Sequence, residues 1–326
     1  MKKVTITDIA TLVGVSKATV SYYLNGNTQK MSLATQEKIR LAIEDTGFKP
    51  SKIARSLVTK DTKTIGVVIA DITNPFITQV MKGIHDTCTK LGYSVNFTNS
   101  DNDPKIEKEN IDRLYQQNVS GIIIDTVDAN SQLITSLSYR KTVMVDRQAK
   151  KPTLDTVVSN NKESTKDFIR MMKDRGYEDI YFVTFPIKNI STRELRYEGF
   201  KEIMGTRGDR LIVLGESDIE ARIREILTNS SKKVAFFTMN GPTLLSFMQI
   251  LNQIEFTYPD DFGLGSYEDL DWMEVLNPNV SCIRQDSYGI GVKAAEHLIN
   301  KLTSDDSDQQ PELIVVPSKS VLRHSF

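Results

Sequence analysis

The first part of the chain contains two short stretches in which apolar residues recur at the spacing of an α-helix. Between residues 5 and 26 these apolar residues are Ile9, Leu12, Val13, Val15, Val20 and Leu24, and they could share one small core. Gly14 allows a sharp turn between the two stretches, and Ser16 suits the N-cap of the second. The pattern predicts two short helices around a tight turn.

Residues 32–47 continue this unit with a third predicted helix. Ser32 can cap its start and Gly47 can end it. Its apolar side is expected from Ile39, Leu41, Ala42 and Ile43. The chain is therefore expected to begin with a small three-helix domain.

Beyond residue 62 the pattern changes to short apolar runs that alternate with amphipathic helical stretches. The runs predict strands at 65–70, 94–98, 121–125, 143–146, 180–184, 211–214, 234–238 and 262–265. Such runs are typical of parallel strands that helices cover on both faces. We expect two successive doubly wound α/β halves, whose ligands bind beyond the carboxyl ends of the strands.

Length and composition agree with several domains and narrow the class of protein. A chain of 326 residues exceeds the usual size of a single core. No segment offers the roughly 20 apolar residues of a membrane-spanning helix. Cys88 and Cys282 lie far apart, which gives neither a disulfide framework nor a metal-ligand cluster. These features predict a cytoplasmic protein with no membrane segment and no metal site.

The overall charge of −1 hides an asymmetry along the chain. Residues 1–60 contain ten Lys or Arg and four Asp or Glu, a net charge of +6, whereas the remainder contains 31 basic and 38 acidic residues, a net charge of −7. A basic run alone is more often a solvated face than a binding site. Here it accompanies a helix pair whose second helix presents Lys17, Ala18, Thr19, Ser21 and Tyr22 near its outward start. A helix-turn-helix offers such residues to bases and phosphates, so this end is predicted to bind double-stranded DNA in a salt-dependent manner.

Several motifs along the chain resemble those of the lactose-repressor family of bacterial transcription regulators. The helix pair reads TITDIATLVGVSKATVSYYLNG, and the likeness continues through SLATQEKIRLAIEDTGFKP, KIARSL, IGVVIADITNPF, NSDNDP, GIIID, VDR, RELRYEGF and RQDSYGIGVKAAEHL. The resemblance thus covers essentially the whole chain. It implies an α/β protein with a three-helix helix-turn-helix headpiece and a two-lobed, periplasmic-binding-protein-like core of doubly wound parallel sheets.

The resemblance also implies domain boundaries. The headpiece would span 1–47, a hinge helix and linker 48–61, and an effector-binding and dimerisation core 62–326. The chain would cross between the lobes near Asn160, near Asp286 to Gly289 and near Pro317. Lobe one would comprise about 62–160 and 290–316, and lobe two about 161–289 and 317–326.

For DNA binding, the resemblance points to the headpiece and the hinge. The implied residues are Thr5, Ser16, Lys17, Ala18, Thr19, Ser21, Tyr22, Asn25, Ala54 and Leu57. Two hinge helices of a dimer would lie in the minor groove, where Leu57 wedges between base pairs. Many members carry Arg where this chain has Tyr22, so the base preference at that position is expected to differ.

For effector binding, the resemblance points to residues at the strand ends. The implied residues are Asn74, Phe76, Ile77, Asp146, Arg193, Arg196, Asn240, Glu268 and Gln285. Two guanidinium groups suit a carboxylate or a polyol. Either arginine by itself is more often a surface salt-bridge partner, but position in the motif favours Arg196 as a ligand. Gly241 stands where many members carry Asp. Trp272 is interpreted either as a pocket residue or as a packing residue.

The function that follows from the resemblance is control of transcription by a small molecule. We expect a homodimeric repressor of carbohydrate or sugar-acid catabolic genes that binds a near-palindromic operator, with a sugar or sugar acid as effector and no cofactor. The stretches QKMSLATQEKI, IADITNPF and NSDNDP are most similar to members that respond to sugar acids such as 2-keto-3-deoxygluconate. One alternative is a global catabolite regulator whose corepressor is a phosphorylated carrier protein. Another is a solute-binding protein, which should have a signal sequence and no basic headpiece.

Enzyme chemistry would need a constellation of catalytic residues. His85, His297 and His324 are scattered, and the sequence has neither a metal-ligand pair nor a nucleophile elbow. We therefore expect no enzymatic activity.

Overall fold

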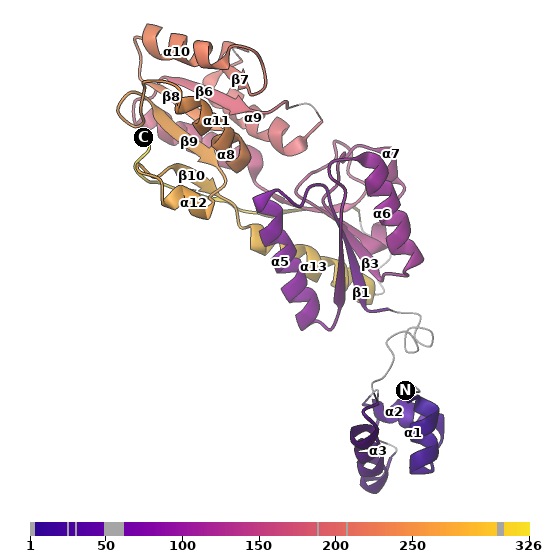
Figure 1. Ribbon diagram of the computed structural model, residues 1–326. Coiled ribbons are helices and arrows are strands. Elements are labelled where there is room, and N and C mark those ends of the chain that lie inside the picture. Colours follow the sequence, from indigo (N-terminus) through magenta and orange to yellow (C-terminus); the bar gives the residue numbers. More distant parts are fainter. Residues whose placement is uncertain are drawn as a thin grey trace. The chain divides into compact units, whose positions relative to one another are not determined.

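The computed structural model describes residues 4–24, 26–29, 31–48, 62–187, 189–206, 208–304 and 310–326. The chain divides into two compact units, Met1–Lys63 and Thr64–Phe326, which we call the headpiece unit and the core unit (Figure 1). Each unit has hydrophobic clusters of its own. In the described part of the chain, no helix combines the length and apolar character that crossing a membrane requires.

The headpiece unit contains the three helices that the sequence predicts. They are α1 (Ile6–Val13), α2 (Lys17–Leu24) and α3 (Leu33–Thr46). A capping box starts α1, because the backbone N–H of Asp8 donates to Thr5 Oγ1 while the Asp8 carboxylate accepts from the Thr5 N–H at 2.8 Å. Gly14 ends α1 with a positive φ of 75°, and Ser16 Oγ accepts from the Thr19 N–H at the start of α2. The sharp turn therefore depends on a residue without a side chain.

The core of the headpiece differs from the predicted one at two leucines. It is formed by Ile9, Ala10, Val20, Ile39, Ala42 and Phe48. Leu12 is 66% exposed and Leu41 is 44% exposed, so both predictions of burial are wrong. The inward side of α1 is centred on Ile9, Ala10 and Val13, and Leu12 is turned roughly 100° away from it. Leu41 follows Ile39 by two positions, which places it on roughly the opposite side of α3.

Lobe one of the core unit is a six-stranded parallel sheet in the order β11-β5-β4-β3-β1-β2. Its strands are β1 (Thr64–Ile69), β2 (Ser94–Asn99), β3 (Gly121–Ile124), β4 (Thr142–Val145), β5 (Asp155–Ser159) and β11 (Leu313–Val316). Its helices are α5 (Pro75–Lys90), α6 (Pro104–Gln116), α7 (Gln132–Thr135), the 3₁₀ turn η1 (Tyr139–Lys141) and α13 (Ser287–Thr303). Helices α5 and α13 bury one face of the sheet, and α6 covers the other (Figure 1).

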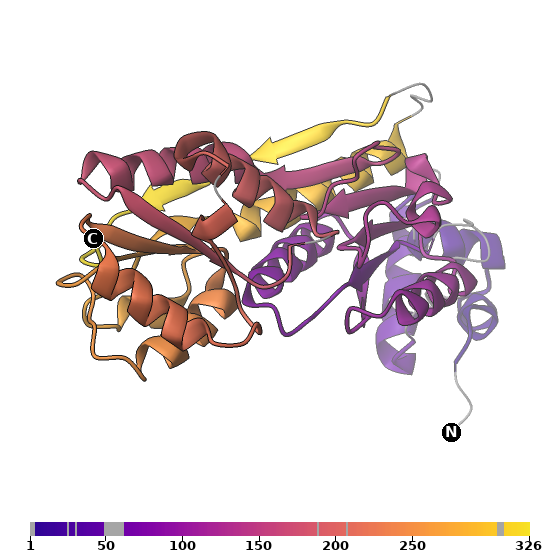
Figure 2. The same ribbon diagram turned by 90° about the horizontal axis from the view of Figure 1, so that it is seen from above.

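Lobe two repeats this plan with a second sheet in the order β12-β10-β9-β8-β6-β7. Its strands are β6 (Asp179–Thr184), β7 (Leu211–Val213), β8 (Val234–Thr238), β9 (Gly263–Tyr267), β10 (Ser281–Arg284) and β12 (Lys319–Val321). Its helices are α8 (Asn161–Asp174), α9 (Ser191–Met204), η2 (Gly208–Arg210), α10 (Ile219–Asn229), α11 (Gly241–Leu251) and α12 (Asp271–Glu274). Helices α8 and α9 pack on one face and α10 and α11 on the other, while β12 alone runs antiparallel to its neighbour (Figure 2).

The chain passes between the two sheets three times. It leaves lobe one after β5, returns after β10 to form α13, and leaves again between β11 and β12. The crossing segments are bonded to one another, since Ser159 Oγ donates to Gln285 Oε1 at 2.7 Å and the Ser318 N–H donates to Asn160 Oδ1 at 2.8 Å. The predicted arrangement of two doubly wound lobes is confirmed.

Two glycines set how closely α5 and α13 pack in lobe one. A Cβ atom at Gly83 would lie 2.2 Å from the carbonyl oxygen of Tyr288, and one at Gly291 would lie 2.1 Å from that of Val80. The helix backbones therefore touch where other residues would hold them apart. Because α5 begins at the end of β1 and α13 begins beside a crossing segment, this contact fixes two elements that border the space between the lobes.

Candidate functional site

The exposed side of α2 carries most of the residues predicted to contact DNA. Lys17, Ala18, Ser21 and Tyr22 occupy positions that fall on one side of a helix, and Tyr22 is 57% exposed. At the end of α2 a hollow of about 350 Å³ is lined by Tyr22, Gly26, Asn27 and Gln29. The tyrosine hydroxyl and the two amides are groups that can hydrogen-bond to base edges or phosphates.

Other residues predicted to contact DNA form hydrogen bonds within the headpiece. Thr5 Oγ1 donates to Asp8 Oδ2 at 2.7 Å, and the hydroxyls of Ser16 and Thr19 lie 2.9 Å apart. Both sets cap helix starts, where backbone N–H groups also favour phosphate. Asn25, Ala54 and Leu57 lie outside the residues that the structure describes, as does nearly all of the predicted hinge.

In lobe one, the segment after β1 presents fewer groups than predicted. Asn74 Oδ1 accepts from the Phe76 N–H at 3.1 Å and so caps α5. Phe76 and Ile77 are buried in the cluster beneath α5. What this segment can offer a ligand is therefore the amide of Asn74 and the edge of an apolar wall.

Carboxyl groups follow two neighbouring strands of lobe one, with Asp125 buried and Asp146 half-buried. Asp125 follows β3, and its Oδ1 has no hydrogen-bond partner within the described chain, although Arg147 Nε lies 3.8 Å away. Burial raises the pKa of Asp125 to about 7, against the opposing charge of Arg147. Asp146 follows β4 with a positive φ of 64°, and burial raises its pKa as well, opposed by Arg196 and Arg147.

Arg196 is the centre of the polar groups in lobe two. It is 3% exposed, and its Nε and Nη1 donate to Asn161 Oδ1 at 2.8 Å and to the Met239 carbonyl at 2.9 Å. Its guanidinium carbon lies 3.6 Å from the centre of the Tyr267 ring. Its charge also favours the ionised forms of Asp146 in lobe one and Glu268 in lobe two.

Glu268 lies over Gly241, the position where a carboxylate was noted as missing. The Gly241 N–H donates to Glu268 Oε2 at 2.9 Å, and a Cβ at residue 241 would lie 2.9 Å from that oxygen and 2.4 Å from Leu270 Cδ1. Glycine at 241 thus makes room for the carboxyl of Glu268. Burial raises the pKa of Glu268 to about 7, in spite of the nearby charge of Arg196.

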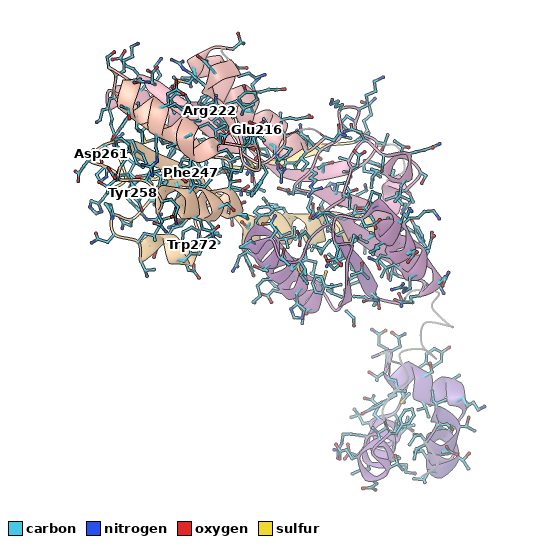
Figure 3. All side chains as sticks on the ribbon, turned by 45° about the horizontal axis from the view of Figure 1, so that its top comes forward. Glu216, Arg222, Phe247, Tyr258, Asp261 and Trp272 are labelled. Carbon is cyan, nitrogen blue, oxygen red and sulfur yellow. The ribbon has the colours of Figure 1, made fainter. Side chains whose placement is uncertain are left out.

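The remaining predicted residues of lobe two differ in how closely they join this group. Gln285 is buried, its Oε1 lies 3.4 Å from Arg196 Nη2, and its Nε2 has no partner within the described chain. Asn240 caps α11 by accepting from the Thr243 N–H at 3.0 Å. Trp272 packs at the margin of the hydrophobic cluster that contains Phe247 (Figure 3). The contacts of Trp272 therefore indicate a packing role.

Asp146, Glu268 and Gln285 are thus linked to the buried guanidinium of Arg196, the first two through its charge and the third by contact. We call these four residues the interlobe charge cluster, and Asp125 and Arg147 neighbour it. The sequence interpretation did not single out Asp125 or Asn161 as site residues. The signal for Asp125 was present, because GIIID ends a strand at the edge where ligands of such sheets bind.

The two carboxyl groups with a pKa of about 7 predict how stability depends on pH. Both pKa values are higher in the folded core than the usual value near 4, so the folded state binds more protons between about pH 4 and pH 7. The free energy of unfolding should therefore fall as the pH rises through this range. We expect a higher melting temperature at about pH 6 than at about pH 8, and Asp125→Asn together with Glu268→Gln should flatten this difference.

Differential scanning fluorimetry from about pH 6 to pH 8 tests this expectation. Glu216→Gln is the matched control, because Glu216 is an exposed acid of lobe two (Figure 3) and should leave the pH profile unchanged. If the melting temperature of the double variant depends on pH as that of the unmodified protein does, the titrating groups lie elsewhere.

Comparison with known proteins gives consistent results for both units. Residues 5–51 match the family described as bacterial regulatory proteins, lacI family, and residues 62–317 match that described as periplasmic binding proteins and sugar binding domain of LacI family. The chain is 30% identical to the HTH-type transcriptional regulator KdgR of Bacillus subtilis over 99% of this chain and 97% of that protein. It is 32% identical to the HTH-type transcriptional regulator PtxS of Pseudomonas putida over 93% of this chain and 91% of that protein.

Among solved structures, the Lac repressor dimer bound to operator and the anti-inducer ONPF has the same fold. Its TM-score is 0.83, with 20% identity over 99% of each chain. The matched families describe regulatory and binding proteins rather than enzymes. The chain therefore belongs to the LacI family, as a DNA-binding transcriptional regulator with a helix-turn-helix headpiece and a sugar-binding domain.

Proposed function

We propose that this protein represses carbohydrate or sugar-acid catabolic genes, and that a small effector bound between the two lobes controls its affinity for operator DNA. The observation that carries this proposal is the interlobe charge cluster, in which the charge of the buried Arg196 of lobe two acts on the carboxyl of Asp146 of lobe one. Buried ionisable groups with perturbed pKa values are costly to stability and gather at functional sites. A ligand that contacts both would sense the relative position of the lobes.

We propose a division of labour along the chain. Residues 1–47 read DNA, residues 48–61 form the hinge and linker, and residues 62–326 bind the effector and the second subunit. Lys17, Ala18, Ser21 and Tyr22 would face the major groove, with Thr5, Ser16 and Thr19 at the phosphates. Such a regulator acts on the chromosome, which places it in the cytoplasm.

The proposed effector site comprises the interlobe charge cluster and the residues around it. Asn74, Phe76 and Ile77 would form the wall in lobe one, and Asn240 the opposite edge in lobe two. Polar groups with unused hydrogen-bonding capacity support this placement, since Asp125 Oδ1 and Gln285 Nε2 are buried without a partner within the described chain. A sugar hydroxyl could donate to the first and accept from the second.

We further propose that the protein acts as a homodimer on a near-palindromic operator, because one headpiece reads only one half-site. Large apolar side chains exposed on the core unit support a second subunit. In lobe two these include Leu245 on α11 and Val275, which directly follows α12 and is 83% exposed. Lobe one offers Ile72 and Tyr288.

The proposed control is a two-state coupling between effector and hinge. An effector that prefers one arrangement of the lobes changes the spacing of the two hinge segments in a dimer, with a typical coupling of roughly 1–3 kcal/mol. Thermal-shift measurements with neutral sugars, sugar acids and sugar phosphates, followed by operator binding with each compound that binds, test this proposal. It fails if bound compounds leave operator affinity unchanged.

Leu57→Ala provides a separate test of the hinge. It is expected to weaken operator binding roughly tenfold or more while changing binding to random-sequence DNA little, because a side chain inserted at a kinked step offsets a few kcal/mol of unstacking. Fluorescence anisotropy with both DNAs measures the two affinities. Val58→Ala is the matched control. If Leu57→Ala lowers the affinity for operator and for random-sequence DNA equally, Leu57 does not insert between base pairs.

A further inference from the structure

The segment after β4 and the start of α9 meet directly across the two lobes. The backbone N–H of Gln148 donates to Ser191 Oγ at 2.9 Å. Arg147 precedes Gln148, and Arg193 lies two residues after Ser191, so both guanidinium-bearing side chains start from segments in contact. The charges of Arg147 and Arg193 lie close enough to oppose each other.

The three arginines of this region differ in how their charges are balanced. Arg147 Nε lies 3.8 Å from the carboxyl of Asp125, and the charge of Arg196 opposes the rise in the pKa values of Asp146 and Glu268. Arg193 forms an ion pair with no acid within the described residues, and the one hydrogen bond found for it there joins its Nη1 to the Pro186 carbonyl at 2.6 Å. Burial, and then the charges of Arg147 and Arg196, lower the pKa of Arg193 to about 10. This cation thus lacks an anion in a partly buried place.

We propose that Arg147 and Arg193 form a seat for a carboxylate group of the effector, with one guanidinium contributed by each lobe. This inference rests on the proposed function, because it names the chemical class of the same effector as a sugar acid. A planar guanidinium presents paired N–H donors that match the two oxygens of a carboxylate. The guanidinium of Arg147 is held by two contacts within lobe one, since Nη1 donates to the Val127 carbonyl at 2.7 Å and Nη2 lies 3.5 Å from Asn102 Oδ1.

The charge surroundings favour a carboxylate over the other candidate groups. A neutral hydroxyl would leave Arg193 without a counter-charge. A phosphate, with nearly two negative charges, would exceed the single unbalanced guanidinium and would face the carboxyls of Asp125 and Asp146. A carboxylate carries one negative charge, which equals the one positive charge, that of Arg193, left without an acid.

The seat also explains how effector charge could select a lobe arrangement. Without an anion, Arg147 and Arg193 repel each other across the lobes. A carboxylate between them attracts both and so favours the arrangement in which Gln148 reaches Ser191. The effector's acid group therefore acts on the lobes, and its sugar hydroxyls remain available to the interlobe charge cluster.

Isothermal titration calorimetry on the full chain tests the seat with matched pairs of ligands. The pairs are gluconate with glucose, galacturonate with galactose, and ribonate with ribose, and glucose 6-phosphate is added as the phosphorylated probe. We expect at least one acid to bind on the order of 10- to 100-fold more tightly than its neutral counterpart, as a charge-assisted pair requires. Arg193→Met should remove this ratio, retain the affinity for the neutral sugar and leave the melting temperature of the free protein undiminished.

Arg222→Met is the matched control, because Arg222 of α10 in lobe two (Figure 3) also donates to a backbone carbonyl, that of Asp209. It should keep the full ratio. Equal binding of acids and neutral sugars, a ratio that Arg193→Met preserves, or preference for the phosphate would each overturn the seat while leaving the proposed function intact. A protein that binds no compound of the panel would count against both.

Discussion

Removal of residues 1–61 is expected to abolish operator binding and to leave a folded core that still binds effector. The headpiece unit and the core unit have separate hydrophobic clusters, so neither needs the other to bury its apolar side chains. The residues proposed to contact DNA all precede residue 62, and the chain beyond residue 60 carries a net charge of −7. Specific binding exceeds non-specific binding by roughly 10³- to 10⁷-fold in such proteins, and an acidic core should retain neither.

The measurement uses DNA that the full chain selects from a random pool, followed by anisotropy with the truncated protein. Val20→Asp in the full chain is a useful companion, because it places a charge in the headpiece core, where Val20 is fully buried. Both proteins should lose DNA binding while the core unit keeps its melting transition. Sequence-specific binding by residues 62–326 alone would refute the division of labour.

Arg196→Met is expected to cost about 3–5 kcal/mol of stability in the core unit and to abolish effector binding. The change removes the cation that faces Asp146 and Glu268, and it frees Asn161 Oδ1 and the Met239 carbonyl from their donor. The buried carboxyl of Glu268 and the half-buried carboxyl of Asp146 would then lose this compensating charge. Because protonation relieves that penalty, the loss of stability should be smaller at about pH 6 than at about pH 8.

Chemical denaturation at both pH values measures the loss, and calorimetry measures effector binding. Arg210→Met is the control, since Arg210 pairs with Asp179 at 2.9 Å and also donates to a backbone carbonyl in lobe two. It should lower stability without this pH dependence and should leave effector binding intact. An Arg196→Met protein that binds effector normally would reduce Arg196 to a packing residue.

The parts of the fold that the sequence predicts well are those whose periodicity extends over a whole element. The three headpiece helices and the eight proposed strands are all present, the strands to within two residues at each end. The predicted burial of Leu12 and Leu41 is wrong because helical spacing alone does not say which apolar residues lie at the middle of the buried face of a helix. In α1 and α3 the small residues Ala10 and Ala42 belong to that buried face. Four strands were not predicted. Of these, β5 and β10 mix polar with apolar residues, and β11 and β12 are short strands at sheet edges.

The candidate site was harder to predict than the fold, for a reason visible in Arg193 and Arg196. They lie three residues apart on one helix, and the sequence treats them as a pair. The structure places Arg196 inward against Tyr267, whereas Arg193 donates to the Pro186 carbonyl. Likewise, the consequence of Gly241 depends on the reach of Glu268, a contact between two strand ends. Such pairings belong to tertiary packing and have no local signature.

The three crossings between the sheets affect how the protein is made. The headpiece can fold early in translation, whereas lobe one waits for β11 and lobe two for β12, both of which follow every other strand of the two sheets. A stop codon before Leu313 would remove an edge strand from both lobes at once and leave the DNA-reading helices untouched. Late nonsense mutations should therefore yield products that keep the operator-binding headpiece but have lost a folded core unit that responds to a metabolite.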